Sequence, residues 1–204
     1  TFAPTPIQYP TKLEADLVIH SLTKFMNGHG DAIGGAVLGK RELIHKIKWP
    51  SMPCFTGACM TPMNAWLILR GLRTLDMRVE RHCKNGLAIA EFLENHPLVD
   101  KVNYPGLKSS PDYFLCQTQM NGMGGGMLSF TLKTFTNDED RIKMTKEFIN
   151  RVKLITIATS LGEQHTLISL YDGGLVRIAT GLESSRDLIS DLKQALDKTY
   201  DEVK

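Results

Sequence analysis

A lysine that directly follows an apolar run is the residue of this chain best suited to covalent chemistry. Residues 15–20 are largely apolar and partly β-branched, which predicts a buried strand; Ser21, Thr23 and Lys24 follow it, before a glycine-rich stretch. A lysine beside partly buried surface is more readily deprotonated, and the neutral amine can form a Schiff base with a carbonyl cofactor. Ser21 and Thr23 add hydroxyl groups, and the glycines leave backbone N–H groups accessible, as phosphate binding requires. From this pattern alone, a solvated lysine in a loop is an equally good interpretation.

The same residues allow a second chemistry. Ser21 and Lys24 have the Ser-x-x-Lys spacing of enzymes in which an acylated serine is the nucleophile. Those enzymes need further Ser-Asp-Asn and Lys-Thr-Gly elements, which the chain does not match. Their serine also opens a helix, whereas Ser21 follows a predicted strand. The surroundings of Lys24 therefore favour the cofactor chemistry.

An arginine inside an apolar strand pattern is the next candidate. Arg177 is the lone charge of residues 174–179, and a buried guanidinium must be paired. Its planar fork suits a carboxylate, which can belong to a substrate or to an Asp or Glu of the core. Ser160 ends another apolar run and could reach the same site.

Strand and helix patterns alternate along the chain, which predicts an α/β or α+β fold. Strands are expected at residues 15–20, 32–39, 99–104, 124–132, 154–158 and 175–179, and helices at 40–48, 111–119, 138–150 and 184–200. The longest helical pattern covers residues 61–95, where Thr61 and Pro62 form a helix start and Gly71 and Gly86 are candidates for bends or breaks. A helix of that length often joins two domains. Residues 50–62 carry three prolines and Gly57, so they are expected to be a loop.

The composition argues against several classes of protein. The 204 residues are 42% hydrophobic and 23% charged, and the net charge of +2 gives no reason to expect nucleic acid or a membrane as partner. None of the four cysteines forms a Cys-x-x-Cys pair, which argues against zinc and predicts free thiols in the cytoplasm. No apolar run approaches the ~20 residues of a membrane span. The first residues are not typical of a signal peptide, and without an initial Met the chain is expected to be processed or trimmed.

These residues belong to a longer pattern that resembles the Cys/Met-metabolism enzymes of fold type I, which use pyridoxal phosphate. Residues 16–25 and 27–31 resemble the cofactor-lysine segment of that family. Further matches follow in order over nearly the whole chain, at residues 56–58, 69–75, 78–82, 104–107, 160–162 and 174–177. Residues 27–31 and 77–83 resemble the methionine γ-lyase branch in particular. The resemblance implies the C-terminal part of such an enzyme: residues 1–75 would end the large cofactor domain with its linking helix, and residues 76–204 would form a small α+β domain.

The resemblance also implies roles for the residues singled out above. Lys24 would hold pyridoxal 5′-phosphate covalently, and Ser21 and Thr23 would contact the cofactor phosphate. Ser160 and Arg177 would bind the substrate, Arg177 through its α-carboxylate. The implied reaction is γ-elimination on a sulfur amino acid, which converts L-methionine to 2-oxobutanoate, ammonia and methanethiol. Alternatives are a cystathionine γ-lyase, cystathionine γ-synthase or O-acetylhomoserine sulfhydrylase reaction, and a non-catalytic relative that kept the fold.

Four further expectations come from comparing this sequence with the family pattern. The chain begins just downstream of the family's Asp that pairs with the cofactor nitrogen, so we expect it to be inactive without the other half, in cis or as a separate chain. Only residues 163–174 separate the Ser-Leu-Gly and Leu-Val-Arg motifs, fewer than in the family, through a deletion or a loop missing from the sequence. Thr159 stands where cystathionine enzymes usually carry Glu, which argues mildly against cystathionine. The family forms dimers of dimers, so a homo-oligomer is expected.

Overall fold

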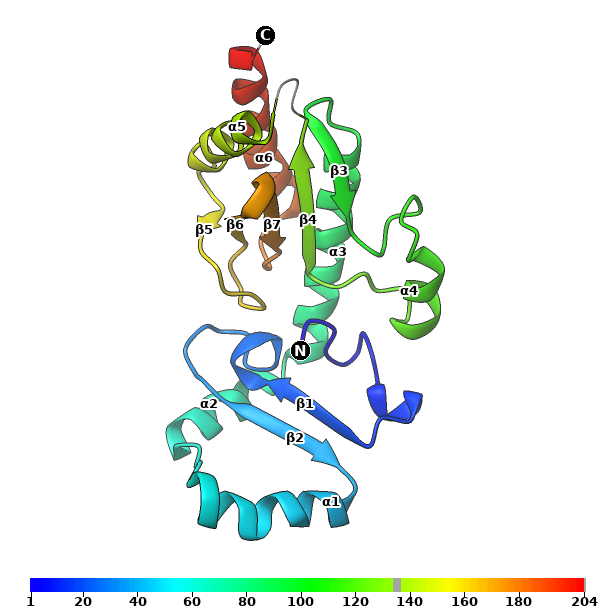
Figure 1. The fold of residues 1–204 in the computed structure, drawn as a ribbon, viewed down its shortest axis with the longest axis vertical. Helices are drawn as coiled ribbons and strands as arrows, with labels where there is room; N and C mark the ends of the chain where they lie inside the picture. Colours follow the sequence, from blue (N-terminus) through cyan, green and yellow to red (C-terminus); the bar gives the residue numbers. More distant parts are fainter. Residues whose placement is uncertain (134–136, 204) are drawn as a thin grey trace.

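The computed structural model describes residues 1–133 and 137–203, and in this part of the chain it shows two β-sheets (Figure 1). β1 (Leu17–Ser21) and β2 (Gly35–Gly39) form an antiparallel pair. The larger sheet has the strand order β3 (Val99–Asn103), β4 (Met127–Leu132), β7 (Leu175–Ala179), β6 (Leu167–Tyr171) and β5 (Thr156–Ile157). Its strand pairs are antiparallel except for β5 and β6. The expected α/β class is confirmed.

Helices pack on the larger sheet and connect it to the smaller one. α3 (Leu75–Glu94), α5 (Asp138–Asn150) and α6 (Ser185–Val203) pack with the five-stranded sheet, and in Figure 1 α3 runs from the smaller sheet up along the larger one. The other helices are α1 (Arg41–Lys46), α2 (Pro62–Leu72) and α4 (Tyr113–Gln119), with short helical segments η1 (Pro10–Leu13), η2 (Leu22–Met26), η3 (Ile47–Thr56) and η4 (Asp172–Gly174). None of the described helices is both long and apolar enough to cross a bilayer.

The main core lies between the five-stranded sheet and these helices. Alternate residues of β4 are buried, so its period-2 pattern directs one row of side chains, including Phe130, toward the helices. The ring of Phe130 meets that of Phe148 from α5 edge-on, with centroids 5.9 Å apart. Burial of each such side chain contributes about 1.5–3 kcal/mol, which makes this sheet a firm support for the residues at its ends.

A smaller cluster joins the N-terminal part of the chain to the ends of the larger sheet. It contains Ile7, Phe25, Leu161 and Ala179, which come from four separate segments. Phe25 is 1% exposed, and its ring meets that of His82 edge-on at 5.1 Å. Because Phe25 directly follows Lys24, this packing fixes the Lys24 segment against the loop after β5 and the end of β7.

The helical pattern over residues 61–95 forms two helices, α2 and α3, separated by Arg73 and Thr74. Gly71, one of the two candidate bends or breaks in that pattern, lies just before this turn. The expectation for the segment before these helices was wrong. The loop expected over residues 50–62 is helical as far as Thr56. Trp49 is extended (φ −138°, ψ 126°), so Pro50 stands in the first turn of a new helical stretch, where its missing N–H costs nothing.

Two expectations about strands also need correction. β1 was expected to be buried, yet Ile19 is 71% exposed and His20 is the strand's one buried residue. β1 pairs with β2 on one side, and no described element covers the face that carries Ile19. The second correction is β6, which lies inside residues 163–174, where no strand was expected. Its run of Leu167 and Ile168 is apolar and was an available signal.

Candidate functional site

Lys24 lies where the smaller sheet meets the end of the larger one. It follows β1 within η2, but its own backbone angles are not helical (φ −90°, ψ −135°). The side chain is half-buried, and Nζ donates a hydrogen bond to Ser160 Oγ at 3.2 Å. The two residues are 136 positions apart, so tertiary packing, and not a local motif, brings them together.

Arg177 reaches the same place from β7. Its Nη2 donates to the carbonyl oxygen of Thr159 and, at 3.2 Å, to that of Ser160. The guanidinium carbon lies 5.0 Å from the centre of the Tyr171 ring, within the range of a cation–π contact. Among the described residues no Asp or Glu makes an ion pair with Arg177, which contradicts its pairing with a core carboxylate. Its Nε is buried and has no hydrogen-bond partner there, so the guanidinium keeps donor capacity for an external carboxylate.

The hydroxyl groups of Ser21 and Thr23 have different surroundings. Thr23 Oγ1 accepts from the backbone N–H of Gly34 at 3.1 Å and donates to the carbonyl oxygen of Gly34 at 3.4 Å. The backbone N–H of Ser21 donates to Thr1 Oγ1 at 2.9 Å, while the hydroxyl of Ser21 makes no hydrogen bond to any described residue. Ser21 is therefore the freer donor for a phosphate, and Thr23 must give up its bond to the Gly34 carbonyl to serve as one.

Two buried residues of α3 that were not expected to have a role lie beneath the Lys24 segment. Arg78 donates to backbone carbonyls of the Lys24 segment, and burial lowers the pKa of its guanidinium. Nδ1 of His82 lies within hydrogen-bond distance of the carbonyl oxygen of Thr180, and burial lowers the pKa of His82 to about 4. Because a carbonyl only accepts, the proton of the neutral ring is on Nδ1. Both residues fall on the apolar stripe of α3 with Leu75 and Val79, and that spacing was the available signal.

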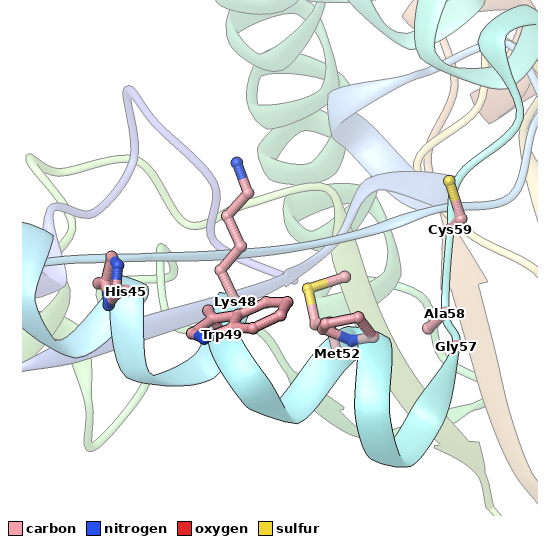
Figure 2. A pocket seen from close by; sticks show the side chains of 8 residues that line it. His45, Lys48, Trp49, Met52, Gly57, Ala58 and Cys59 are labelled. Atoms are coloured by element: carbon pink, nitrogen blue, oxygen red, sulfur yellow. The ribbon is translucent and has the colours of Figure 1, made fainter.

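Two hollows help to delimit the site. One runs along η3 and is lined by His45, Lys48, Trp49, Met52, Pro53, Gly57, Ala58 and Cys59 (Figure 2). None of the five residues predicted to bind cofactor or substrate lines it. The other is beside Arg177, and its lining includes Phe2, Met127, Tyr171 and Leu175. The guanidinium of Arg177 is thus next to an apolar wall.

These groups fit a cofactor that carries both an aldehyde and a phosphate. Lys24 provides an amine, and within residues 1–133 and 137–203 the Ser21 hydroxyl and the buried Nε of Arg177 have no hydrogen-bond partner. Together they can bind an aldehyde, a phosphate and a carboxylate respectively.

Comparisons with known proteins identify the family. The model of the Cys/Met metabolism PLP-dependent enzymes matches residues 1–173, and the chain belongs to this family. Membership implies pyridoxal 5′-phosphate as the cofactor. The chain is 44% identical over 216 residues to the L-methionine gamma-lyase of Treponema denticola, covering 97% of this chain and 52% of the relative. It is 37% identical over 217 residues to the cystathionine gamma-lyase of Dictyostelium discoideum, covering 97% of this chain and 54% of the relative.

A solved structure resembles the whole fold. The crystal structure of cystathionine gamma synthase from Xanthomonas oryzae pv. oryzae, in complex with aminoacrylate and cysteine, matches with a TM-score of 0.89 at 35% identity. The match covers 98% of this chain and 54% of that chain, so this chain spans about half the length of the relatives it matches. The family resemblance seen in the sequence is confirmed, and the coverage agrees with one part of a fold type I enzyme.

Proposed function

We propose that the chain is the C-terminal part of a pyridoxal-phosphate-dependent carbon–sulfur lyase that performs γ-elimination on a sulfur amino acid, with L-methionine as the first candidate. The observation that carries this proposal is the convergence of Lys24, Ser160 and Arg177 from three distant segments. Pyridoxal phosphate, when bound, supplies an electron sink that stabilises negative charge on the substrate carbon.

Each residue of the site has a role in this proposal. Lys24 attaches the cofactor through Nζ and, once released, carries protons between the substrate carbons as acid and base. Ser160 Oγ orients that amine from 3.2 Å. Arg177 binds the substrate α-carboxylate, and the carbonyl oxygens of residues 159 and 160 hold its guanidinium in place. Ser21 binds the cofactor phosphate, with Thr23 as a second donor.

The relatives differ in substrate, so the choice of methionine rests on this chain's own residues. The hollow beside Arg177 has a largely apolar wall of Phe2, Met127 and Leu175, with Asn103 and Ser129 as its polar members, and this wall suits an uncharged thioether better than the second amino-acid end of cystathionine. Thr159 supports the same choice. The alternatives are a cystathionine γ-lyase, cystathionine γ-synthase or O-acetylhomoserine sulfhydrylase reaction, and then a non-catalytic relative.

We further propose that the active protein contains the other half of its relatives' length, in cis or as a separate chain. In that protein residues 1–75 end the large domain, residues 76–204 form the small domain, and the whole assembles as a dimer of dimers. The exposed side chains of Ile19, Ile33 and Phe55 support this proposal, because large apolar surfaces mark interfaces. A cytoplasmic location is supported by the free state of all four cysteines.

The test is to record the visible absorption spectrum of the chain with pyridoxal phosphate, before and after borohydride, alone and mixed with a chain that supplies the other half. We expect the mixture to show a yellow band that borohydride bleaches, the cofactor's mass on the Lys24 peptide, and release of methanethiol from L-methionine. Lys24→Ala should abolish all three, and Lys40→Ala, which removes an exposed lysine, should change none. Absence of the band in the mixture, or persistence of the activity in Lys24→Ala, would overturn the proposal.

A further inference from the structure

Arg78 of α3 is a buried cation whose partners are backbone oxygens and one hydroxyl. It is 6% exposed. Its Nη1 donates to the carbonyl oxygen of Phe25 at 2.8 Å, and Nη2 donates to those of Met26 at 3.3 Å and Gly71 at 2.7 Å. Nε donates to Thr74 Oγ1 at 3.0 Å. In the described part of the chain no carboxylate forms an ion pair with Arg78, so these hydrogen bonds alone offset the cost of burying its charge.

The bonds of Arg78 join three segments at one point. Phe25 and Met26 directly follow Lys24, Gly71 is in the last turn of α2, and Thr74 precedes α3. The fork geometry of a guanidinium allows one side chain to reach all of them, which a lysine ammonium with three donors at a single point does not.

The backbone around Arg78 is shaped to admit it. Gly28 has a φ of +70°, and a Cβ at that position would lie 1.8 Å from Arg78 Nη1. The backbone N–H of Gly28 also donates to the carbonyl oxygen of Lys24 at 2.8 Å. The guanidinium therefore fills the space that a side chain at residue 28 would take, directly under the turn that carries Lys24.

From this geometry we propose that Arg78 is a positioning residue for Lys24. By holding the carbonyl oxygens of residues 25 and 26, it fixes the backbone from which the Lys24 side chain extends to Ser160. Arg78 acts through that backbone, since none of its hydrogen bonds is to Lys24, Ser160 or Arg177. The inference rests on the proposed function of Lys24.

The test compares Arg78→Met and Arg78→Lys with Arg73→Met, which removes an exposed arginine nearby. Trace acetylation with acetic anhydride, followed by peptide mass spectrometry across pH 7 to 10, reports the reactivity of each lysine in the chain without cofactor. Hydrogen–deuterium exchange reports opening of residues 22–28. Loss of charge-assisted hydrogen bonds should speed exchange of that segment about tenfold in Arg78→Met, with a smaller change in Arg78→Lys. At each pH, the rate of Lys24 acetylation should then approach that of Lys101, an exposed lysine on β3, because the Lys24 side chain is no longer held against Ser160.

The outcomes separate a local effect from a general loss of stability. The proposal holds if Lys24 and residues 22–28 change while Lys101 and the five-stranded sheet do not, and Arg73→Met matches the wild type. It is overturned if folded Arg78→Met matches the wild type, or if the changes are spread evenly over the chain. If Arg78→Met does not fold, the same comparison is made with Arg78→Lys. Failure of pyridoxal phosphate to attach to Lys24 counts against the proposed function only, because neither measurement needs the cofactor.

Discussion

Replacement of Asp191 tests how the segment that leads to Ser160 is held. Asp191 lies on α6 and is 7% exposed. Its Oδ2 accepts from the backbone N–H groups of Leu154 at 2.8 Å and Ile155 at 3.0 Å, and both of its oxygens accept from that of Lys153. This segment continues through β5 to Ser160, so one carboxylate anchors the approach to the site.

The magnitude follows from these bonds. Asp191→Ala removes the acceptors of three N–H groups, of which that of Ile155 is buried. A hydrogen bond to a charged group contributes about 1.5–3 kcal/mol. Water replaces part of the loss at the two more exposed groups, so we expect the free energy of unfolding to fall by about 3–5 kcal/mol. For a chain of this size that corresponds to a decrease in Tm of roughly 6–20 °C.

The measurement is urea unfolding at pH 7 followed by far-ultraviolet circular dichroism. Asp187→Ala, at an exposed position on the same helix, is the matched control and should change the free energy by less than about 1 kcal/mol. Asp191→Asn keeps one acceptor oxygen and should lose about half as much as Asp191→Ala. A loss below about 1 kcal/mol in Asp191→Ala, or an equal loss in Asp187→Ala, would refute the reasoning.

Two other predictions concern buried groups. Because the pKa of His82 is about 4 in the folded protein and near 6.5 when unfolded, its contribution to stability is complete above pH 6.5 and decreases as the pH falls toward 4, by up to roughly 3 kcal/mol. Urea unfolding measured from pH 7 to 4 should show this decrease in the free energy of unfolding, and His82→Gln should make the decrease smaller. An equal decrease in His82→Gln would contradict the lowered pKa of His82. A maleimide should modify two thiols of the native protein rapidly and the other two only after unfolding. Burial shields that second pair and raises the pKa of the Cys83 thiol to about 11. Equal modification rates for all four thiols would contradict this prediction. The exposed pair is Cys54 and Cys59, and the buried pair is Cys83 and Cys116.

Elements with a strong local signal could be predicted from the sequence. Thr61 Oγ1 caps α2 by accepting from the backbone of Asn64, and Asn137 Oδ1 caps α5 by accepting from that of Asp140. Gly71 indicated a bend or break close to the turn between α2 and α3, but the residues of the turn itself could not be placed, because the apolar periodicity continues through Arg73. The local sequence predicts that both segments are helical, but the position of the turn between them depends on the contacts of both helices with other segments.

The site shows the same division between local and long-range information. Lys24 and Ser160 could be named from the apolar runs that they follow, and Arg177 from the apolar strand around it. The contact between Lys24 and Ser160 depends on packing between residues 136 positions apart. The role of Arg78 could not be predicted, because its partners are carbonyl oxygens, which every residue carries. The exposure of β1 was missed because an apolar run predicts burial without showing which element supplies the cover.

The pairing of β1 with β2 has a consequence for work on the chain in isolation. A ribbon two strands wide, paired from Leu17 with Gly39 to Ser21 with Gly35, is marginally stable in water, and no other described strand pairs with its outer edges. Its apolar side chains, such as those of Ile19 and Val37, stand in solvent. Such an edge is a template on which further strands can add. We therefore expect colloidal solubility, more than the free energy of unfolding, to limit the concentration at which this chain can be studied, and we expect sulfate, which strengthens apolar association, to lower that limit further.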